Sequence, residues 1–237
     1  MAVKSKAVGF ERAAAAALKW NIETTQLQKG VYRFFTRGIH TPALQLARTW
    51  RSLGTHLGGE IPPGAVVLAF ALNHGARIQF RGRQVFRREL IVQEDSSGLD
   101  FSFMDAIDII SIAVNREELE RRAMCLWQKP FPIKSRTGVL RFSDTGTFDR
   151  TGQHFTSLLE EWLEKPADLT KVSAARMLEK SVLDGLLGQL EDHSKAAGTV
   201  DRHKAARRAA NFLHERCKEE ISITDLCAAV GANRRTL

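Results

Sequence analysis

The chain has 237 residues, of which 43% are hydrophobic and 26% charged, so it is long enough to bury a sizeable core in one or two domains. No apolar run has the length of a membrane span, and Glu11 and Arg12 interrupt the alanine-rich start, so a secretory signal sequence is not expected there. The formal net charge of +8 favours nucleic acid or another polyanion as a partner. The cysteines number 3, an odd count, so a disulfide framework is not expected and we predict a cytoplasmic protein without membrane contact.

The first part of the chain, 1–29, is predicted to be a tail that leads into a short helix. From 30 to 114, short apolar or alternating runs are broken by glycine and proline, which predicts the strands of an antiparallel barrel or sandwich. Two turns are specific. In Pro62–Gly64 proline presets φ and glycine accepts positive φ, and Phe80–Arg83 has the composition of a tight hairpin around Gly82.

Helical patterns follow over 115–198. Asn115 is a candidate N-cap followed by acidic residues, and Pro166 stops a later helix. The next helix carries an apolar stripe at spacings of three and four, formed by Val172, Ala175, Leu178, Val182, Leu186 and Leu190. The stripe either packs on its own domain or pairs two subunits, and the sequence does not separate the two. We assign this segment to a helical dimerisation region and expect a homodimer.

The last part of the chain, 199–237, is typical of a basic helix followed by a helix-turn-helix. Thr224 is the candidate cap of the first of two short helices, and Gly231 supplies the turn between them. The start of the second helix is where a recognition helix meets DNA. The candidate DNA-binding residues there are Asn233, Arg234 and Arg235. A generic helical hairpin is the alternative.

The stretch RRAANFLHERCKEEISITDLCAAVGANRRTL resembles the first helix-turn-helix of the AraC family of bacterial transcription activators, in the order ITDLCAAVG and in the ending RRTL. The resemblance implies binding to promoter DNA. It also implies an α+β fold class, with a cupin-like β-barrel sensor domain and a helical dimerisation element before an all-α AraC-type domain. Such domains hold two helix-turn-helix units, and the sequence ends at Leu237 inside the first. We therefore expect a truncated DNA-binding domain and weak specific DNA binding by these residues alone.

A cluster of arginines lies within RGRQVFRRELIVQEDSSG, in the middle of the predicted β domain. Its Arg-x-x-x-Arg spacing and downstream Asp-x-Ser resemble the signature of PilZ domains, although Gly98 comes two residues earlier than in that signature. A regulator of exopolysaccharide synthesis within the AraC family has a similar arrangement. The resemblance implies that cyclic di-GMP is bound by Arg81, Arg83, Arg87, Arg88, Asp95, Ser96, Ser97 and Gly98.

The chemistry of these side chains fits a ligand with two phosphates and two guanines. A guanidinium can donate two hydrogen bonds to guanine O6 and N7, or pair with a phosphate. Asp95 could accept hydrogen bonds from guanine N–H groups, and Gly98 would let the backbone approach the ligand. Arg83 and Arg87 are separated by an even number of residues, so in a strand they would share one face. On a loop after Gly82 they could instead clamp a base from two sides. The alternative is a solvated, arginine-rich hairpin.

No catalytic or metal site is predicted, since His40, His56 and His74 lack the spacing of a metal-binding cupin and the serines lack a nucleophile motif. The favoured function is a transcription regulator that binds cyclic di-GMP as an effector and controls DNA binding, at exopolysaccharide genes. One alternative is an AraC-type regulator that senses a sugar or another small metabolite in the barrel. The other is a metal-free cupin enzyme.

Overall fold

The structure is a computed structural model of the chain, which describes residues 2–8, 20–73, 75–94, 98–131, 138–142 and 144–190. Toward the C-terminus it describes residues 209, 212–213, 216, 221–223 and 225–226. For residues 2–8 and for position 141 only the backbone is described. The chain divides into two compact units, Met1–Ala196 and Ala197–Leu237.

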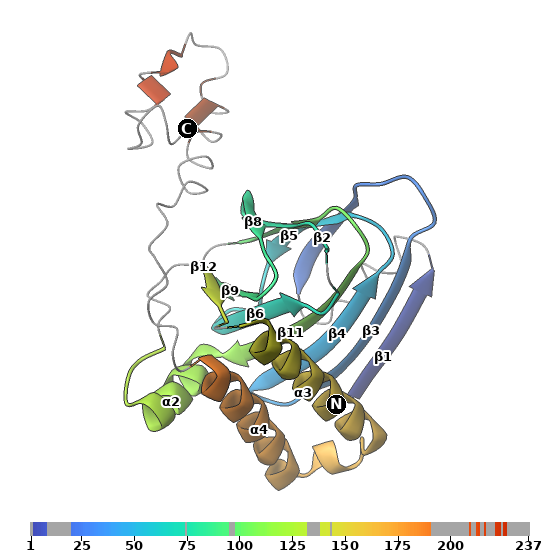
Figure 1. Cartoon of the computed structure of the whole chain (residues 1–237), viewed down its shortest axis with the longest axis vertical. Coiled ribbons are helices and arrows are strands. Elements are labelled where there is room, and N and C mark those ends of the chain that lie inside the picture. The colour runs from blue at the N-terminus through green and yellow to red at the C-terminus, as the bar shows by residue number, and fades with distance from the viewer. Residues whose placement is uncertain are drawn as a thin grey trace. The chain divides into compact units, whose positions relative to one another are not determined.

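Two antiparallel sheets form the β part of the first unit (Figure 1). The seven-stranded sheet has, in spatial order, β1 (Ala2–Val8), β3 (Arg33–His40), β4 (Leu44–Arg51), β11 (Ile107–Asn115), β6 (Ala65–Ala71), β9 (Glu89–Glu94) and β12 (Gly138–Arg141). The five-stranded sheet has β2 (Asn21–Gln26), β5 (Thr55–Glu60), β10 (Leu99–Phe103), β7 (Ile78–Phe80) and β8 (Arg83–Val85). All pairings between neighbours are antiparallel, which confirms the predicted α+β class with an antiparallel β part.

The central strands of the seven-stranded sheet are buried along almost their whole length because both of their faces are covered. Every residue of β9 is buried, as is every residue of β6 except the last. Side chains alternate between the two faces, so Leu68 and Phe70 pack toward the helices while Ala69 packs with residues of the five-stranded sheet. Phe101 and Phe103 of β10 belong to the second of these clusters, which lies between the sheets.

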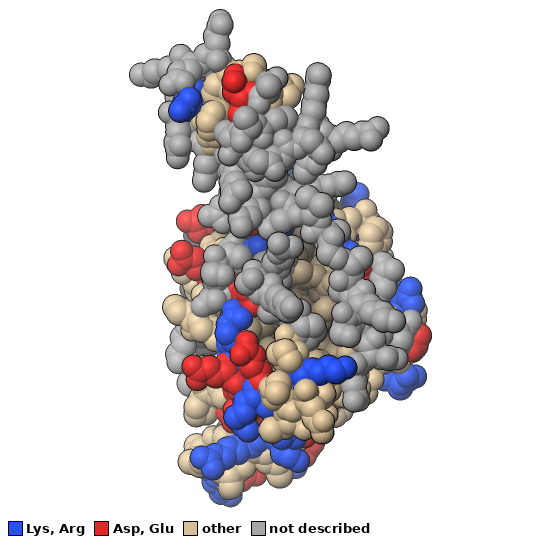
Figure 2. Space-filling view, turned by 90° about the vertical axis from the view of Figure 1, so that its left-hand side faces the viewer, with Lys and Arg blue, Asp and Glu red and all other residues tan. Residues whose placement is uncertain are grey.

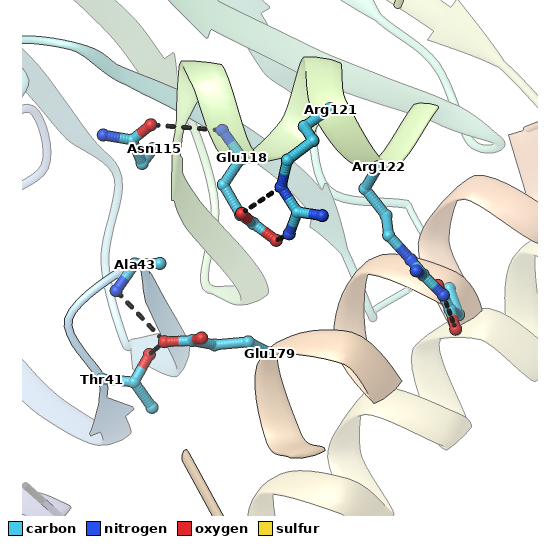
Figure 3. Close-up of polar contacts among 8 residues, drawn as sticks. Thr41, Ala43, Asn115, Glu118, Arg121, Arg122 and Glu179 are labelled. Carbon is cyan, nitrogen blue, oxygen red and sulfur yellow. Dashed lines mark hydrogen bonds and ion pairs between the residues drawn. The ribbon is translucent and has the colours of Figure 1, made fainter. Parts of the chain in front are cut away.

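Three helices cover the outer face of the seven-stranded sheet (Figure 1). They are α2 (Arg116–Trp127), α3 (Thr145–Glu164) and α4 (Val172–Leu190), with the short 3-10 helix η2 (Asp168–Thr170) before α4. The side chain of Asn115 caps α2 by accepting a hydrogen bond from the backbone N of Glu118, as predicted (Figure 3). Also as predicted, α3 ends before Pro166. None of the helices in the described ranges is long and apolar enough to cross a membrane.

Polar contacts join the helices to one another and to the β3–β4 turn (Figure 3). The guanidinium of Arg122 in α2 donates to both carboxylate oxygens of Asp184 in α4. Glu179 of α4 accepts hydrogen bonds from Thr41 Oγ1 at 2.5 Å and from the backbone N of Ala43 at 3.2 Å. These contacts connect α4 to α2 and to the turn between β3 and β4.

Basic and acidic side chains are intermixed on the side of the molecule shown in Figure 2. Ion pairs explain part of this mixture, because many arginines of the first unit lie against carboxylates. The positive net charge of the sequence therefore does not form one continuous basic surface among the described residues on this side.

Two predictions of local structure are wrong. Residues 2–8 and 21–26, predicted to be tail and helix, form β1 and β2, which pair with β3 and β5. Residues 138–141, assigned to the helical region, form β12, which extends the seven-stranded sheet beside β9. These short segments become strands because partners far away in the sequence supply their hydrogen bonds, and local patterns do not report such partners.

The apolar stripe of α4 packs inside its own chain. Leu178, Val182 and Leu186 have no exposed surface, whereas Val172 at the start of the helix is 68% exposed. The first of the two interpretations of the stripe is therefore correct, and the side chains proposed for a subunit contact are used in the core. The homodimer stays a prediction that needs a different surface.

A capping box begins a helix in the second unit. Ser222 Oγ accepts a hydrogen bond from the backbone N of Asp225 at 3.1 Å, and the Asp225 carboxylate accepts one from the backbone N of Ser222 at 3.1 Å. Leu226 N then donates to the Ser222 carbonyl, as in a helix. The cap therefore lies two residues before the predicted Thr224, which is itself outside the described residues.

Candidate functional site

The arginine hairpin consists of β7, β8 and the connection to β9, residues 78–89. Phe80 pairs with Arg83 across a turn in which Arg81 and Gly82 have φ values of 52° and 72°. Positive φ at both central positions is the geometry that matches the right-handed twist of the flanking strands. The predicted tight hairpin around Gly82 is confirmed.

Arg81 connects the arginine hairpin to Gly98, the last residue of the predicted Asp-Ser-Ser-Gly motif. Its Nη2 donates to the Gly98 carbonyl at 2.6 Å across a sequence separation of 17 residues. Gln93 Nε2 donates to the same carbonyl at 2.7 Å. Gly98 has a φ of 66°, a conformation that glycine adopts without steric strain. The fold thus brings Gly98 to the turn of the arginine hairpin.

A buried carboxylate holds Arg83. Arg83 Nη2 donates to Glu89 Oε1 at 3.0 Å, and the other oxygen of Glu89 accepts a hydrogen bond from the backbone N of Phe86 at 2.9 Å. The side chain of Glu89 is 2% exposed, whereas that of Arg83 is 42% exposed. Loss of Arg83 would remove a cation from a buried carboxylate, so this arginine stabilises the fold while part of its guanidinium stays accessible.

Arg87 points away from the barrel toward α3. Its Nη2 donates to Asp149 Oδ2 at 2.7 Å, and the two side chains are 44% and 37% exposed. Exposed pairs of this kind contribute about 0–1 kcal/mol, so another anion could replace Asp149 at low cost. The neighbouring Arg88 has a φ of 75°, and its carbonyl accepts a hydrogen bond from Phe142 N next to β12.

Of the two arrangements considered for Arg83 and Arg87, the shared face of one strand does not occur. Arg83 lies in β8, whereas Arg87 lies in the turn before β9, so the alternation of a strand does not apply between them. The two guanidiniums instead engage different carboxylates, Glu89 inside the barrel and Asp149 on α3. Their role in ligand binding stays a prediction. The candidate ligand residues Asp95, Ser96 and Ser97 lie outside the described residues.

Sequence analysis missed an ion pair at the far end of β9. Glu94, the residue before the predicted ligand motif, is buried, and its Oε1 accepts a hydrogen bond from Arg116 Nη1 at 2.7 Å. Arg116 is the first residue of α2. The run ELIVQED gave no signal of this contact, because an acidic residue at a strand end is ordinarily solvated. The pair links the candidate ligand segment to the helical layer.

A second polar cluster, on β5 and β10, does not form a catalytic triad. His56 Nδ1 lies 2.8 Å from Ser102 Oγ and 3.9 Å from Asp100 Oδ1. In a Ser–His–Asp triad the serine and the carboxylate contact opposite ring nitrogens, whereas here both face the same one. Within the described ranges, no three His, Cys, Asp or Glu side chains are grouped to hold a metal ion. His40 lies at the end of β3, and His74 is outside those ranges.

The candidate DNA-binding residues Asn233, Arg234 and Arg235 are also outside the described residues. The described part of the second unit nevertheless contains helical residues on both sides of the Ser222 cap, at Phe212–Leu213 and Asp225–Leu226.

Comparison with solved structures shows that the fold occurs in a known protein. The chain is similar to the crystal structure of the AraC-like transcriptional activator CuxR over 98% of this chain and 87% of that one, with a TM-score of 0.54 and 13% identity. At this identity the likeness establishes the fold alone. ToxT from Vibrio cholerae strain SCE256 matches 89% of this chain and 74% of that one, with a TM-score of 0.40 and 8% identity. KdgF from Halomonas sp. matches 41% and 90%, with a TM-score of 0.28 and 12% identity. The sequence matches no protein-family model and no curated protein.

Proposed function

We propose that this chain is a ligand-responsive transcription regulator of the AraC type. The observation that carries the proposal is the likeness to CuxR, which extends over 98% of the chain and therefore includes both units. A β barrel with a helical layer, followed by a helix-turn-helix segment, suits a sensor that controls a DNA-binding element. Promoter DNA would be contacted through Asn233, Arg234 and Arg235, as the resemblance to the family implies.

The proposed effector is cyclic di-GMP, bound at the arginine hairpin. The hydrogen bond from Arg81 to the Gly98 carbonyl supports this proposal, because it connects the hairpin that carries the Arg-x-x-x-Arg spacing to the residue that directly follows the Asp-x-Ser sequence. The guanidiniums of Arg81, Arg83, Arg87 and Arg88 would pair with the phosphates or guanine edges, and Asp95 would accept from guanine N–H groups. The serine hydroxyls of Ser96 and Ser97 would donate to phosphate.

The ion pairs of the free protein suggest different roles for the two main arginines. Arg87 would leave Asp149 for a ligand phosphate, because that pair is exposed and weak. Arg83 would keep Glu89, since the carboxylate is buried, and would offer the remaining N–H groups of its guanidinium to the ligand. A substitution of Arg83 would therefore change both stability and affinity, which makes Arg87 the cleaner probe.

The same contacts give a route from the ligand to the helices. Binding that removes Arg87 from Asp149 would act directly on α3, and a shift of the segment after Glu94 would act on α2 through Arg116. A ligand can change the DNA-binding state only through its different affinity for the two states. In this proposal the difference arises from the exchange of Asp149 for a phosphate.

Calorimetry with cyclic di-GMP tests the proposal. The wild-type chain should release or absorb heat on saturable binding. Arg87→Ala and Asp95→Ala should each weaken binding by about 2 kcal/mol, roughly 30-fold, because Arg87 loses a charge pair with phosphate and Asp95 loses charged hydrogen bonds to guanine. Unfolding by urea should show that both variants keep their stability.

The matched control is Arg121→Ala, because Arg121 is an exposed arginine whose ion pair with Glu118 lies within one turn of α2. Its affinity should equal that of the wild type. Arg122 is not a suitable control, since it joins α2 to Asp184 of α4. No binding by the wild type would reject the cyclic di-GMP proposal, whereas equal affinity in all variants would move the site away from the arginine hairpin.

A further inference from the structure

Phe86 presents an aromatic ring to solvent within the arginine hairpin. Val85 before it is buried in the cluster between the sheets, whereas Phe86 is 52% exposed. Phe86 is the most exposed aromatic side chain among the described residues, and Trp50 follows at 37%. A single exposed apolar residue is ordinary on a protein surface, so its surroundings decide whether it has a role in binding.

The buried carboxylate of Glu89 positions Phe86 and Arg83 together. Glu89 Oε2 accepts a hydrogen bond from the backbone N of Phe86 at 2.9 Å, and Oε1 accepts one from Arg83 Nη2 at 3.0 Å. Since the two donors contact the two oxygens of one carboxylate, the guanidinium of Arg83 lies close to the backbone of Phe86. The side chain of Arg83 is 42% exposed, so a ligand can reach both the ring and the guanidinium from solvent and needs no internal cavity.

The turn from Phe86 to Glu89 holds this arrangement in an uncommon backbone conformation. The backbone N of Glu89 donates to the Phe86 carbonyl at 3.0 Å, and Arg88, the third residue of the turn, has a φ of 75°. Glycine is the usual residue with positive φ at this position of a turn, because a side chain is disfavoured there. Backbone strain of this kind is concentrated at binding sites, where the surrounding structure holds the chain in a shape that suits the ligand.

We propose that the ring of Phe86 stacks on a guanine base of cyclic di-GMP while Arg83 donates to the O6 and N7 edge of the same base. The inference rests on the proposed function and adds to it a residue that binds the base instead of the phosphates. An aromatic ring stacks on any base, whereas a guanidinium at the base edge selects guanine. The two side chains together would make the site specific for a guanine nucleotide.

Calorimetry with cyclic di-GMP on the whole chain measures the contribution of the ring. Phe86→Leu should weaken binding by about tenfold, because the stack between base and ring is lost. Phe86→Trp should bind at least as tightly as the wild type, since a stacking surface is retained. The matched control is Trp50→Leu, which removes an exposed aromatic ring from β4 and should stay within about twofold of the wild type.

Two further measurements separate stacking from a general loss of affinity. In proton NMR of the saturated complexes, the ring current of Phe86 should place the H8 resonance of the stacked guanine upfield in the wild type relative to Phe86→Leu. A change in folding alone would not produce this difference. Cyclic di-AMP, whose adenine edge has a donor in place of O6, should bind to the wild type at least about tenfold more weakly than cyclic di-GMP.

The outcomes distinguish this inference from the proposed function on which it rests. An absence of saturable binding of cyclic di-GMP to the wild type would overturn both. Binding that Arg87→Ala weakens and Phe86→Leu leaves unchanged would keep the proposed effector and overturn the stacking alone. The same H8 position in the two complexes, or equal affinity for cyclic di-AMP and cyclic di-GMP, would also overturn the inference.

Discussion

The two sheets of the barrel differ in what covers them. The central strands β11, β6 and β9 of the seven-stranded sheet lie between the five-stranded sheet and the helical layer, and they are buried almost throughout. The five-stranded sheet leaves its outer face to solvent. In β2, for example, exposed and half-buried residues alternate, with Asn21, Glu23 and Thr25 exposed.

This difference would separate the residues that stabilise the fold from those of the proposed binding site. Most of the large buried side chains belong to the cluster between the seven-stranded sheet and the helices. The arginine hairpin includes β7 and β8, at one edge of the five-stranded sheet, and Gly98 leads into β10 of the same sheet. A sheet with one open face and a free edge can change its contacts on ligand binding without opening the main core.

The largest expected effect is in the helix-covered core. Phe70 of β6 is 1% exposed, and its ring contacts the rings of Phe142, Phe148 and Phe155. Phe70→Ala should lower the free energy of unfolding by about 3–5 kcal/mol, because a large cavity remains. The control Thr25→Ala, on the open face, should change it by about 0.5 kcal/mol or less. Urea unfolding measures both, and similar values for the two variants would refute the contrast between the sheets.

The next effect concerns the pair of Glu94 and Arg116. The side chain of Glu94 is 3% exposed and that of Arg116 is 31% exposed. Arg116→Met should cost about 3 kcal/mol, because it leaves a buried carboxylate without this cation. The double variant Arg116→Met/Glu94→Leu should recover much of the loss, since the buried carboxylate at this position is then removed together with its cation. If the loss of stability in the double variant equalled the sum of the losses in Arg116→Met and Glu94→Leu, the two residues would not act as a pair.

Local patterns in the sequence predicted the features that depend on neighbours along the chain. The hairpin around Gly82, the Asn115 cap and the end of α3 before Pro166 are all encoded within a few residues, and all are confirmed. The burial of the α4 stripe was one of two interpretations, because an apolar helix face has the same pattern whether it packs on its own chain or on another.

Features that depend on distant contacts were not predictable in this way. β12 exists because β9 supplies its hydrogen bonds, and Arg87 finds Asp149 at a sequence separation of 62 residues. The shared strand face of Arg83 and Arg87, one of two arrangements considered, does not occur because β8 ends at Val85, before Arg87. The arginines were recognised as a cluster, but their carboxylate partners were not.

A smaller effect is expected for the exposed pair of Arg87 and Asp149. A double-mutant cycle with Arg87→Ala and Asp149→Ala should give a coupling of about 0.2–1 kcal/mol in urea unfolding, because both side chains are solvated. Added salt should reduce it further. A coupling above about 2 kcal/mol would mean that the hairpin is anchored to α3 as firmly as Arg116 is to Glu94, and an anion would then not displace Asp149 easily.

The smallest effect should come from Arg77 and Asp105, near the end of β10. Arg77 donates to both oxygens of Asp105 at 2.9 and 3.0 Å, and these hydrogen bonds lower the pKa of the Asp105 carboxyl. A lowered folded-state pKa means that the contribution to stability is present above the unfolded pKa of about 4 and is lost as the pH falls through the folded value. Carbon-13 NMR should therefore find a titration midpoint for Asp105 below 3.8, and Arg77→Gln should move the midpoint up toward that value. The same midpoint in the wild type and in Arg77→Gln would show that the contact does not persist in solution. Water can compete for an exposed ion pair at this open end of the five-stranded sheet.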